Sequence, residues 1–302
     1  MDEGPTSPVA GRGIFTWRGQ PIKPGAMRKA MVTGLCCLWG ALPLAWTAEP
    51  KPVEPDFTAM SLEDLGSIKV PTVVGASKHE QKITEAPSAV SIVTQEDIRQ
   101  FGYRTMGDLL RSVRGFYVTY DRAYNFTGLR GVNRPGDFGG RVLINLDGHR
   151  LNEPIYDSAF THTDFLLDMD LIDRVEIIRG PGSSLYGNNA FFTVINVVTR
   201  RGRDLSGAEA STTAGSYDTY TGRLSYGQQF STNGVELLIS GTWMDSEGHD
   251  DLRYPAFSAE NNGVAEGMDG SRARSVYASL SYGELSLSGG YIDREKDVTT
   301  TF

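Results

Sequence analysis

Residues 179–202 read RGPGSSLYGNNAFFTVINVVTRRG, and this stretch decides the fold. The preceding segment, IDRVEII at 172–178, mixes apolar residues with charges in the manner of a strand with one buried face. Gly180-Pro181-Gly182 must end that strand, because proline donates no ladder hydrogen bond and glycine adopts backbone angles closed to other residues. The β-branched run at 194–199 predicts a second buried strand. The stretch therefore predicts two strands joined by a tight, glycine-rich link.

The link and its neighbours match a known signature. Arg179-Gly180-Pro181, followed by Leu185-Tyr186-Gly187, Ala190 and Val194-Ile195-Asn196, resembles the plug-domain signature of TonB-dependent outer-membrane receptors. The family usually has glycine or another small residue before Val-Ile-Asn, whereas this chain has Thr193. That difference bears on how closely the backbones approach there and leaves the resemblance intact. Without the resemblance, the same residues describe an ordinary β-loop-β unit of an α+β domain.

Two short helices and further strands are expected ahead of this link. Thr94 with Asp97 predicts a helix N-terminus, and Thr105 with Asp108 predicts a second helix over residues 106–114. The other expected features are helix-ending glycines at 102 and 115, strands at 87–93, 116–118 and 141–146, and a type I′ turn at Asp147-Gly148.

These pieces follow the order found in the plug family, so the resemblance covers residues 86–202. It implies an α+β plug domain, a small mixed sheet with short helices, over residues 76–203. The positions that carry the signature, and that we assign to the plug and its attachment, are Arg130, Gly131, Asp147, Gly148, Arg179, Gly180, Pro181, Tyr186 and Gly187.

Arginines of the plug have a structural role in the family that the chain resembles. They pair with barrel carboxylates and hold the plug in the barrel lumen, and the loss of a buried partner is costly. We expect the barrel partners in this protein to lie beyond Phe302. The alternative for each arginine is a solvated position at a strand end. The candidates are Arg130, Arg141, Arg179, Arg200 and Arg201.

Beyond Gly202 the sequence alternates between apolar and polar residues. The alternation covers 220–230, 235–243, 276–282 and 285–291, with a weaker first strand at 208–214. Strands of this kind, joined by short turns on one side and by a longer loop at 246–270, are typical of a transmembrane β-barrel. A soluble sandwich also alternates, but the plug ahead of these strands favours the barrel.

Residues 204–302 are therefore interpreted as the first antiparallel strands of a barrel. About five strands cannot close, and an open edge in lipid would leave backbone groups unsatisfied. We accordingly expect the chain to be the N-terminal part of a longer receptor.

The N-terminal region reads as a leader. Residues 27–48 combine a basic start, an apolar run and a small-residue exit, which predicts a secretory signal peptide rather than a membrane-spanning helix. Residues 1–26 are interpreted as a gene-model extension, and residues 49–75 as a linker. Both cysteines, Cys36 and Cys37, lie in the signal run, so the mature chain is expected to have no thiol.

The linker contains a candidate for the element that binds the periplasmic protein TonB. A short apolar segment with a proline cannot be a central strand, but it can add to the edge of a partner's sheet. In the family such a segment, the TonB box, precedes the plug. The alternatives are the first plug strand or plain linker. The candidate box consists of Ile68, Lys69, Val70, Pro71, Thr72, Val73 and Val74.

Composition and spacing exclude several other functions. The net charge of −8 and the pI near 5.1 argue against a nucleic-acid partner. The four histidines lack metal-ligand spacing, and Gly180-Pro181-Gly182 lacks the lysine and hydroxyl of a phosphate loop. Neither Ser183 nor Ser184 lies in a nucleophile elbow. We therefore expect no metal site, no cofactor and no enzymatic activity.

The resemblance implies an outer-membrane transporter with its N-terminus in the periplasm. It would import a scarce small ligand, with an iron-siderophore complex as first choice, using TonB, its inner-membrane energising complex and the proton-motive force. The alternatives are a ligand-sensing signalling receptor and a passive plugged barrel. Ligand would bind at the outer apex of the plug, and the candidate contacts are Tyr120, Tyr124, Asn125, Tyr156, Asp157 and His162.

Overall fold

The computed structural model describes residues 72–73, 81–82, 88–133, 136–230, 234–259 and 261–299. All of them belong to one compact unit, Ile68–Phe302. The predicted extension at 1–26 and the predicted signal peptide at 27–48 lie outside the described residues. So does the linker at 49–75, apart from Thr72 and Val73.

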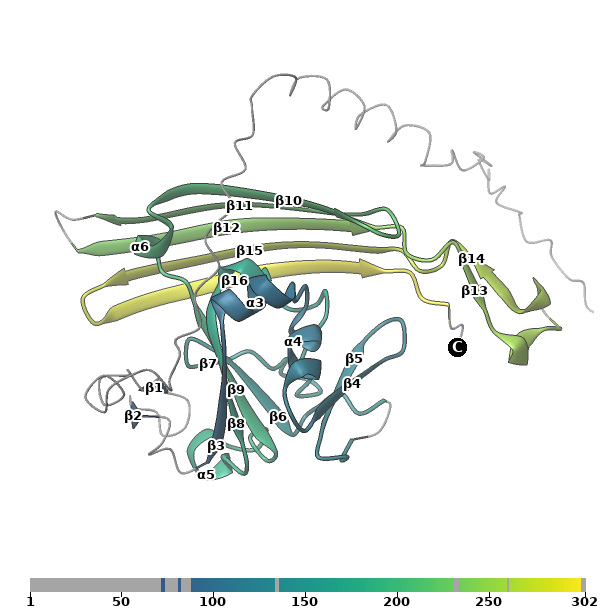
Figure 1. Cartoon of the computed structure of the whole chain (residues 1–302), viewed down its shortest axis with the longest axis horizontal. Coiled ribbons are helices and arrows are strands. Elements are labelled where there is room, and N and C mark those ends of the chain that lie inside the picture. The colour runs from purple at the N-terminus through teal and green to yellow at the C-terminus, as the bar shows by residue number, and fades with distance from the viewer. Residues whose placement is uncertain are drawn as a thin grey trace, which may run out of the picture. The chain divides into compact units, whose positions relative to one another are not determined.

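The plug is built on a mixed five-stranded sheet (Figure 1) with the strand order β3-β8-β9-β6-β7. Strands β8 and β9 are antiparallel neighbours on either side of the glycine-rich link, and β9 runs parallel to β6. The bounds are β3 Ala89–Thr94, β6 Val142–Leu146, β7 His149–Arg150, β8 Ile172–Arg179 and β9 Thr193–Thr199. The predicted pair of strands around residues 179–202 is confirmed.

Helices α3 (Gln95–Phe101) and α4 (Met106–Ser112) begin at the predicted caps. Both Thr94 and Thr105 form capping boxes, with Asp97 and Asp108 respectively. The predicted C-terminus of the second helix is wrong, since α4 ends at Ser112 rather than at residue 114. The reason is Val113, which is buried in the core and takes an extended backbone with ψ 127°.

A two-stranded hairpin, β4 (Phe116–Tyr120) with β5 (Asn125–Leu129), stands beside the sheet. Strand β5 is absent from the prediction, because its sequence, NFTGL, has one β-branched residue and contains Asn125 and Gly128, which are residue types typical of turns. Gly128 lies opposite Tyr117, and a Cβ at Gly128 would fall only 2.5 Å from the Tyr117 hydroxyl oxygen. Glycine is therefore required where the tyrosine ring crosses the partner strand.

The connection between β8 and β9 contains one helical turn, α5 (Ser183–Tyr186), which Gly187 ends with φ 85°. Thr193, unusual for the signature, is completely buried, and its hydroxyl donates to the Ile178 carbonyl oxygen at 2.7 Å. The Thr193 hydroxyl group, which a smaller residue such as glycine would lack, therefore has a hydrogen-bond partner. Strands β8 and β9 keep their register around it. At the other end of β6, Asp147 and Gly148 have φ of 48° and 85°, as a type I′ turn requires.

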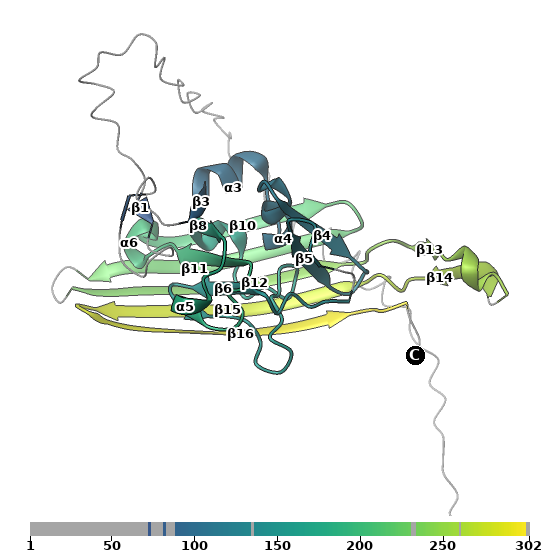
Figure 2. The ribbon, with the colours of Figure 1, turned by 90° about the horizontal axis from the view of Figure 1, so that it is seen from below.

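After the short helix α6 (Gly202–Leu205), the chain forms a second five-stranded sheet, which we call the wall sheet. Its order, β10-β11-β12-β15-β16, is an antiparallel meander, and Figure 2 shows the long strands side by side. The bounds are β10 Gly207–Gly215, β11 Thr219–Phe230, β12 Val235–Ser246, β15 Ser271–Tyr282 and β16 Leu285–Lys296.

As predicted, the connection between β12 and β15 is long and that between β15 and β16 is short; the connection between β10 and β11, at the same end as the long one, is short as well. Between β12 and β15 the chain makes a long excursion with its own small hairpin of β13 (Asp251–Arg253) and β14 (Val264–Glu266). Two 3-10 turns, η3 (Pro255–Phe257) and η4 (Asn261–Gly263), cap that hairpin.

The two faces of the wall sheet have the reverse of the polarity found in a soluble protein. Its buried face carries Arg223, Ser225 and Ser240, whereas Leu224 and Leu287 on the other face are 66% and 72% exposed. Figures 1 and 2 show the plug on the buried face. An exposed apolar face with a polar face turned inward is the pattern of a strand between lipid and a barrel lumen.

One hydrophobic core serves both parts. Ile98, Leu109 and Leu110 of the helices pack with the plug strands, and Leu238 and Tyr277 of the wall sheet join the same cluster. Among the described residues, no helix is long and apolar enough to cross a membrane.

Candidate functional site

Five charged side chains join the plug to the wall sheet. Arg223 of β11 points inward, with only 2% of its side chain exposed. Its Nη2 lies 2.5 Å from Glu209 Oε1 and 3.5 Å from Asp170 Oδ2, and its Nε lies 3.3 Å from Asp168 Oδ1. Arg200, just after β9, places Nη1 3.2 Å from Glu209 Oε2. The plug contributes two carboxylates and one guanidinium and the wall contributes one of each, so ion pairs of both polarities cross the interface.

The plug carboxylates reach Arg223 because of a local turn. The turn η2 (Met169–Leu171) follows Asp168, whose side chain accepts from the Asp170 amide as an N-cap. Burial is the largest effect on the Asp168 carboxyl and raises its pKa, while the Asp170 amide and the Arg223 guanidinium oppose that rise. Arg223 therefore stabilises the ionised form of a carboxylate that has lost most of its water.

Of the predicted latch arginines, Arg200 reaches a wall carboxylate, and the expectation that its partner lies beyond Phe302 is wrong. The signal for Glu209 was an acid at an inward position of the first wall strand. Arg141 pairs within the plug with Asp137 at 3.1 Å. Arg179 donates to the Arg114 carbonyl oxygen and to Ser91 Oγ. The other two lie on the surface, Arg130 with φ 55° and Arg201 as the residue before α6.

The Asp147 turn is also attached to the wall. Asp147 accepts hydrogen bonds from the Thr199 amide at 2.9 Å and from Thr199 Oγ1 at 2.7 Å. Tyr277 of β15 donates its hydroxyl to Asp147 Oδ2 at 3.2 Å. The hairpin turn that the signature marks is thereby fixed to its own sheet and to the wall at once.

At the other end of the interface, Arg294 of β16 holds the loops of the plug. Its Nε donates to Thr163 Oγ1 at 2.8 Å, its Nη2 donates to the Ala123 carbonyl oxygen, and its guanidinium lies over the Tyr124 ring at 5.4 Å. Asp164 Oδ2 is 3.9 Å from Nη1.

Asp269, in the long loop before β15, makes a second attachment there. Lys296 Nζ lies 2.9 Å from Asp269 Oδ1, and Arg122 Nη1 of the plug lies 3.2 Å from Asp269 Oδ2. The β4–β5 turn of the plug, where Arg122 has φ 80°, is thus tied to the loop that precedes β15.

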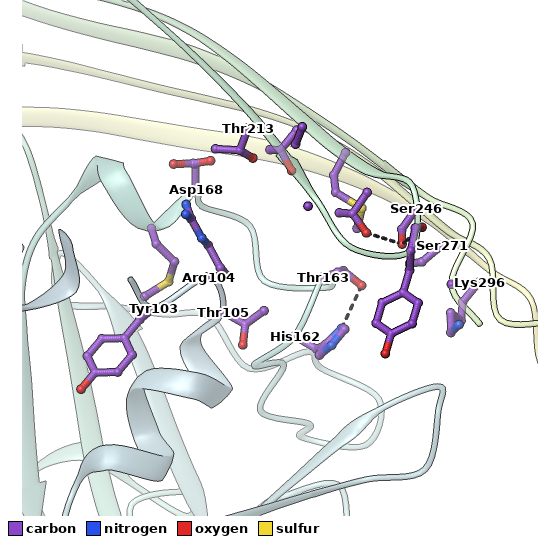
Figure 3. A pocket seen from close by; sticks show the side chains of 18 of the residues that line it. Tyr103, Arg104, Thr105, His162, Thr163, Asp168, Thr213, Ser246, Ser271 and Lys296 are labelled. Atoms are coloured by element: carbon purple, nitrogen blue, oxygen red, sulfur yellow. Dashed lines mark hydrogen bonds between the residues drawn. The ribbon is translucent and has the colours of Figure 1, made fainter. Parts of the chain in front are cut away.

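A cavity of about 500 Å³ lies between these attachments and is open to one side. Figure 3 shows Thr105, Thr163 and His162 of the plug on one side of it, and Thr213, Ser246 and Ser271 of the wall on the other. Residues with hydroxyl groups and charged residues together supply most of its lining positions, so the cavity offers polar partners to water or to a hydrophilic ligand.

His162 and Tyr120 stack at this cavity with ring centroids 4.8 Å apart. Burial, aided by the charge of Arg294, lowers the pKa of the His162 imidazole to about 4. The ring is therefore neutral at physiological pH and presents a flat, uncharged surface.

The other predicted ligand contacts are distributed differently. Tyr124 and Tyr156 both pack on Phe138, with ring centroids 5.6 and 6.2 Å apart, and Asp157 forms an ion pair with Arg150. Asn125 is 6% exposed, and its Nδ2 donates to the Thr161 carbonyl oxygen at 3.4 Å. The structure thus brings Tyr120 and His162 together in one place, and Tyr124 and Tyr156 in another.

Of the candidate TonB box, Thr72 and Val73 are described. They form β1 (Thr72–Val73), which pairs antiparallel with β2 (Gln81–Lys82). Val73 is completely buried in a small cluster that includes Ile178 and Val194. In this conformation Val73 has the packing of a plug residue. The signature residues Gly180, Pro181, Tyr186 and Gly187 lie around α5, where Tyr186 packs on the same cluster.

Sequence reasoning missed the plug residues Arg122, Asp164, Asp168 and Asp170 of the interface, and it missed five further residues on the wall side. Each is a charge in or next to a wall strand, and a charge at an inward position of an alternating strand was the available signal. They are Glu209, Arg223, Asp269, Arg294 and Lys296. Among the residues that the structure describes, no group of His, Asp and Glu side chains is arranged to hold a metal ion.

Comparison with known proteins identifies the fold and its relatives. Residues 82–194 match the model of the TonB-dependent receptor plug domain. The vitamin B12 transporter BtuB of Vibrio vulnificus is 30% identical over 181 residues, which are 59% of this chain and 28% of that protein. An iron-regulated outer membrane virulence protein of Vibrio cholerae is 35% identical over 133 residues, 43% of this chain and 20% of that protein.

Solved structures show the same fold. The pyoverdine outer membrane receptor FpvA of Pseudomonas aeruginosa superposes with a TM-score of 0.57 at 21% identity, over 77% of this chain and 31% of FpvA. The alcaligin receptor FauA of Bordetella pertussis gives 0.55 at 20% identity, over 74% and 35%. The chain thus spans about a third or less of these proteins. The chain thus carries a TonB-dependent receptor plug domain at residues 82–194, followed by antiparallel strands that resemble the barrel of these receptors.

Proposed function

We propose that this protein is part of an outer-membrane importer that takes up a scarce small ligand with energy supplied through TonB. The observation that carries the proposal is the reversed polarity of the wall sheet, whose exposed face is apolar and whose polar face holds a folded plug. A plug on the lumen side of a lipid-facing wall closes a passage that a ligand would otherwise cross unaided. The relatives named as transporters and receptors support the same function.

Ligand would meet the plug at the end of the wall sheet that carries the long loop. There the Tyr120–His162 stack, the tyrosines around Phe138 and the hydroxyl-lined cavity offer flat and polar surfaces together. The side chain of Tyr156 is 72% exposed and available for contact.

The ligand we propose is an iron-siderophore complex. The relatives support two classes, because one is named as a vitamin B12 transporter and others as siderophore receptors or as iron-regulated. At 30–35% identity over part of the chain, these names support the class of ligand and not its structure.

TonB would engage residues 68–74 from the periplasm. Because Val73 is buried in the plug in this structure, engagement would have to draw it out of the cluster around Ile178. That movement would be the first step by which force reaches the plug.

The test is uptake in cells that express the whole coding sequence. Radiolabelled iron-siderophore complexes and labelled cobalamin are compared in strains with and without TonB, and with the proton-motive force collapsed by an uncoupler. We expect uptake of one ligand that requires both. Uptake that continues without TonB would refute energised import, and ligand-induced transcription without uptake would favour a signalling receptor.

A further inference from the structure

Residues 164–171, which we call the strap, form a segment with two different faces. The chain reads Asp-Phe-Leu-Leu-Asp-Met-Asp-Leu, and alternate residues point in opposite directions. Those that enter the core of the plug, all less than 7% exposed, are Phe165, Leu167, Met169 and Leu171. Those that face the wall sheet are Asp164, Leu166, Asp168 and Asp170.

Each end of the strap is held by an arginine of the wall. Arg294 of β16 contacts Thr163 and Asp164 at the start of the strap, and Arg223 of β11 contacts Asp168 and Asp170 at its end. The two arginines are nearly buried, with 11% and 2% of their side chains exposed. The two guanidinium groups are therefore stabilised by the side chains that they contact, because little water reaches them.

The middle of the strap is fitted to β16 by shape. Leu166 lies against Gly290, where an added Cβ would fall 2.8 Å from Leu166 Cδ2 and 2.9 Å from the Val276 carbonyl oxygen. Gly290 is an inward position of β16, and its neighbour Gly289, on the outer face, has nothing within 4 Å of an added Cβ. A glycine therefore stands where the Leu166 side chain leaves no room for a Cβ on the strand.

Detaching the strap would break two kinds of contact together. Lifting it from the wall takes Asp168 and Asp170 away from the buried Arg223, which keeps Glu209, and takes Asp164 away from Arg294. Pulling it from the plug exposes four core side chains. In contrast, β1 has two residues and one buried side chain in a satellite cluster. Force applied at the N-terminal end therefore meets an attachment smaller than that of the strap first.

We propose that the strap stays seated on β11 and β16 when the plug rearranges, so that the plug opens by moving other segments away from it. This inference rests on the proposed import function. On this proposal the plug has two parts: the strap, which stays attached to the wall sheet, and the segments that move during import.

The test is a reversible cross-link between strap and wall. Leu166→Cys is combined with Ser288→Cys, which lies two residues from Gly290 on the inner face, about 7 Å along the strand. The matched control pairs Leu166→Cys with Leu287→Cys, whose side chain lies on the outer face and is 72% exposed. Residues 38–302 contain no cysteine.

Whole cells are treated with a short bis-methanethiosulfonate reagent, and labelled ligand uptake is measured before treatment, after it and after reduction. We expect the pair 166/288 to cross-link at equal rates with and without TonB, the pair 166/287 not to cross-link, and uptake to be retained in the cross-linked receptor. Uptake lost on cross-linking and restored by reduction would overturn the proposal. So would failure of the pair 166/288 to cross-link.

Failure of the proposed function would look different. In that case the unmodified receptor would show no TonB-dependent uptake of any ligand. The cross-linking pattern still decides whether the strap is seated, because it requires no transport.

Discussion

Replacing Arg223 with methionine tests whether the buried charge cluster holds the plug to the wall. Methionine keeps most of the volume of the side chain and removes its charge. Of the three carboxylates that Arg223 contacts, Asp170 and Glu209 are 35% and 34% exposed, and Glu209 keeps Arg200. Asp168 is the one that loses its compensation, with only 18% of its side chain exposed.

The expected loss of stability follows from the small exposed fraction of the Asp168 side chain. Breaking a fully buried ion pair costs about 3 to 5 kcal/mol, and breaking an exposed one costs about 0 to 1 kcal/mol. Asp168 keeps some water and can take up a proton, so we expect R223M to lower the stability of the docked plug by about 2 to 3 kcal/mol. Because protonation relieves the uncompensated carboxylate, the deficit should shrink as the pH falls through the raised pKa of Asp168.

The assay is urea unfolding of the plug in the detergent-solubilised receptor, followed by near-ultraviolet circular dichroism. The control is Arg150→Met in β7, which removes the same charge from a side chain that is 46% exposed and whose carboxylate partner, Asp157, is 48% exposed. For the control we expect a loss below about 1 kcal/mol. If both variants shift the midpoint equally, the cluster does not fasten the plug, and the reasoning from burial is wrong.

Three further outcomes can be measured in the same way. Gly290→Ala should lower stability because its Cβ meets Leu166 and strand backbone at 2.8 to 2.9 Å, whereas Gly289→Ala should be neutral. If the two substitutions lower stability equally, Leu166 is not closely packed against Gly290. The pKa of His162 falls from 6.5 unfolded to about 4 folded, so its contribution is complete above pH 6.5 and is lost as the pH falls to 4. At pH 5.5 the loss should be about 1 kcal/mol and absent in His162→Gln; an unchanged pH profile would contradict this. Thr105→Ala removes the α4 cap and should cost about 1 kcal/mol, with no change refuting the capping box.

Much of the plug could be predicted because its signals are local. Thr94 and Thr105 each satisfy backbone amides within their own helix, and Asp147-Gly148 determines a turn by its own backbone angles. Strand β5 was harder to predict than the equally buried β6, because NFTGL has neither alternation nor a β-branched run to mark it as a strand. The end of α4 depended on Val113 entering the core, which is a tertiary effect.

The interface was harder to predict because its partners are far apart in sequence. Arg223 meets Asp168 and Asp170 across more than fifty residues, and nothing near either end of that separation specifies the pairing. The strand pattern did predict which face of β11 would turn inward. An inward charge such as Arg223 needs an oppositely charged partner. The fold alone shows that the plug partners are Asp168 and Asp170.

The opposite polarities of the two ion-pair sets have a mechanical consequence. Glu209 lies between Arg200 of the plug and Arg223 of its own sheet, while Arg223 also faces the plug carboxylates. Sliding the plug along the sheet would strip a cation from Glu209 and an anion from Arg223 in the same step. Small displacements of the plug along the sheet are therefore unfavourable. We expect the plug to be either fully attached to the sheet or fully released from it.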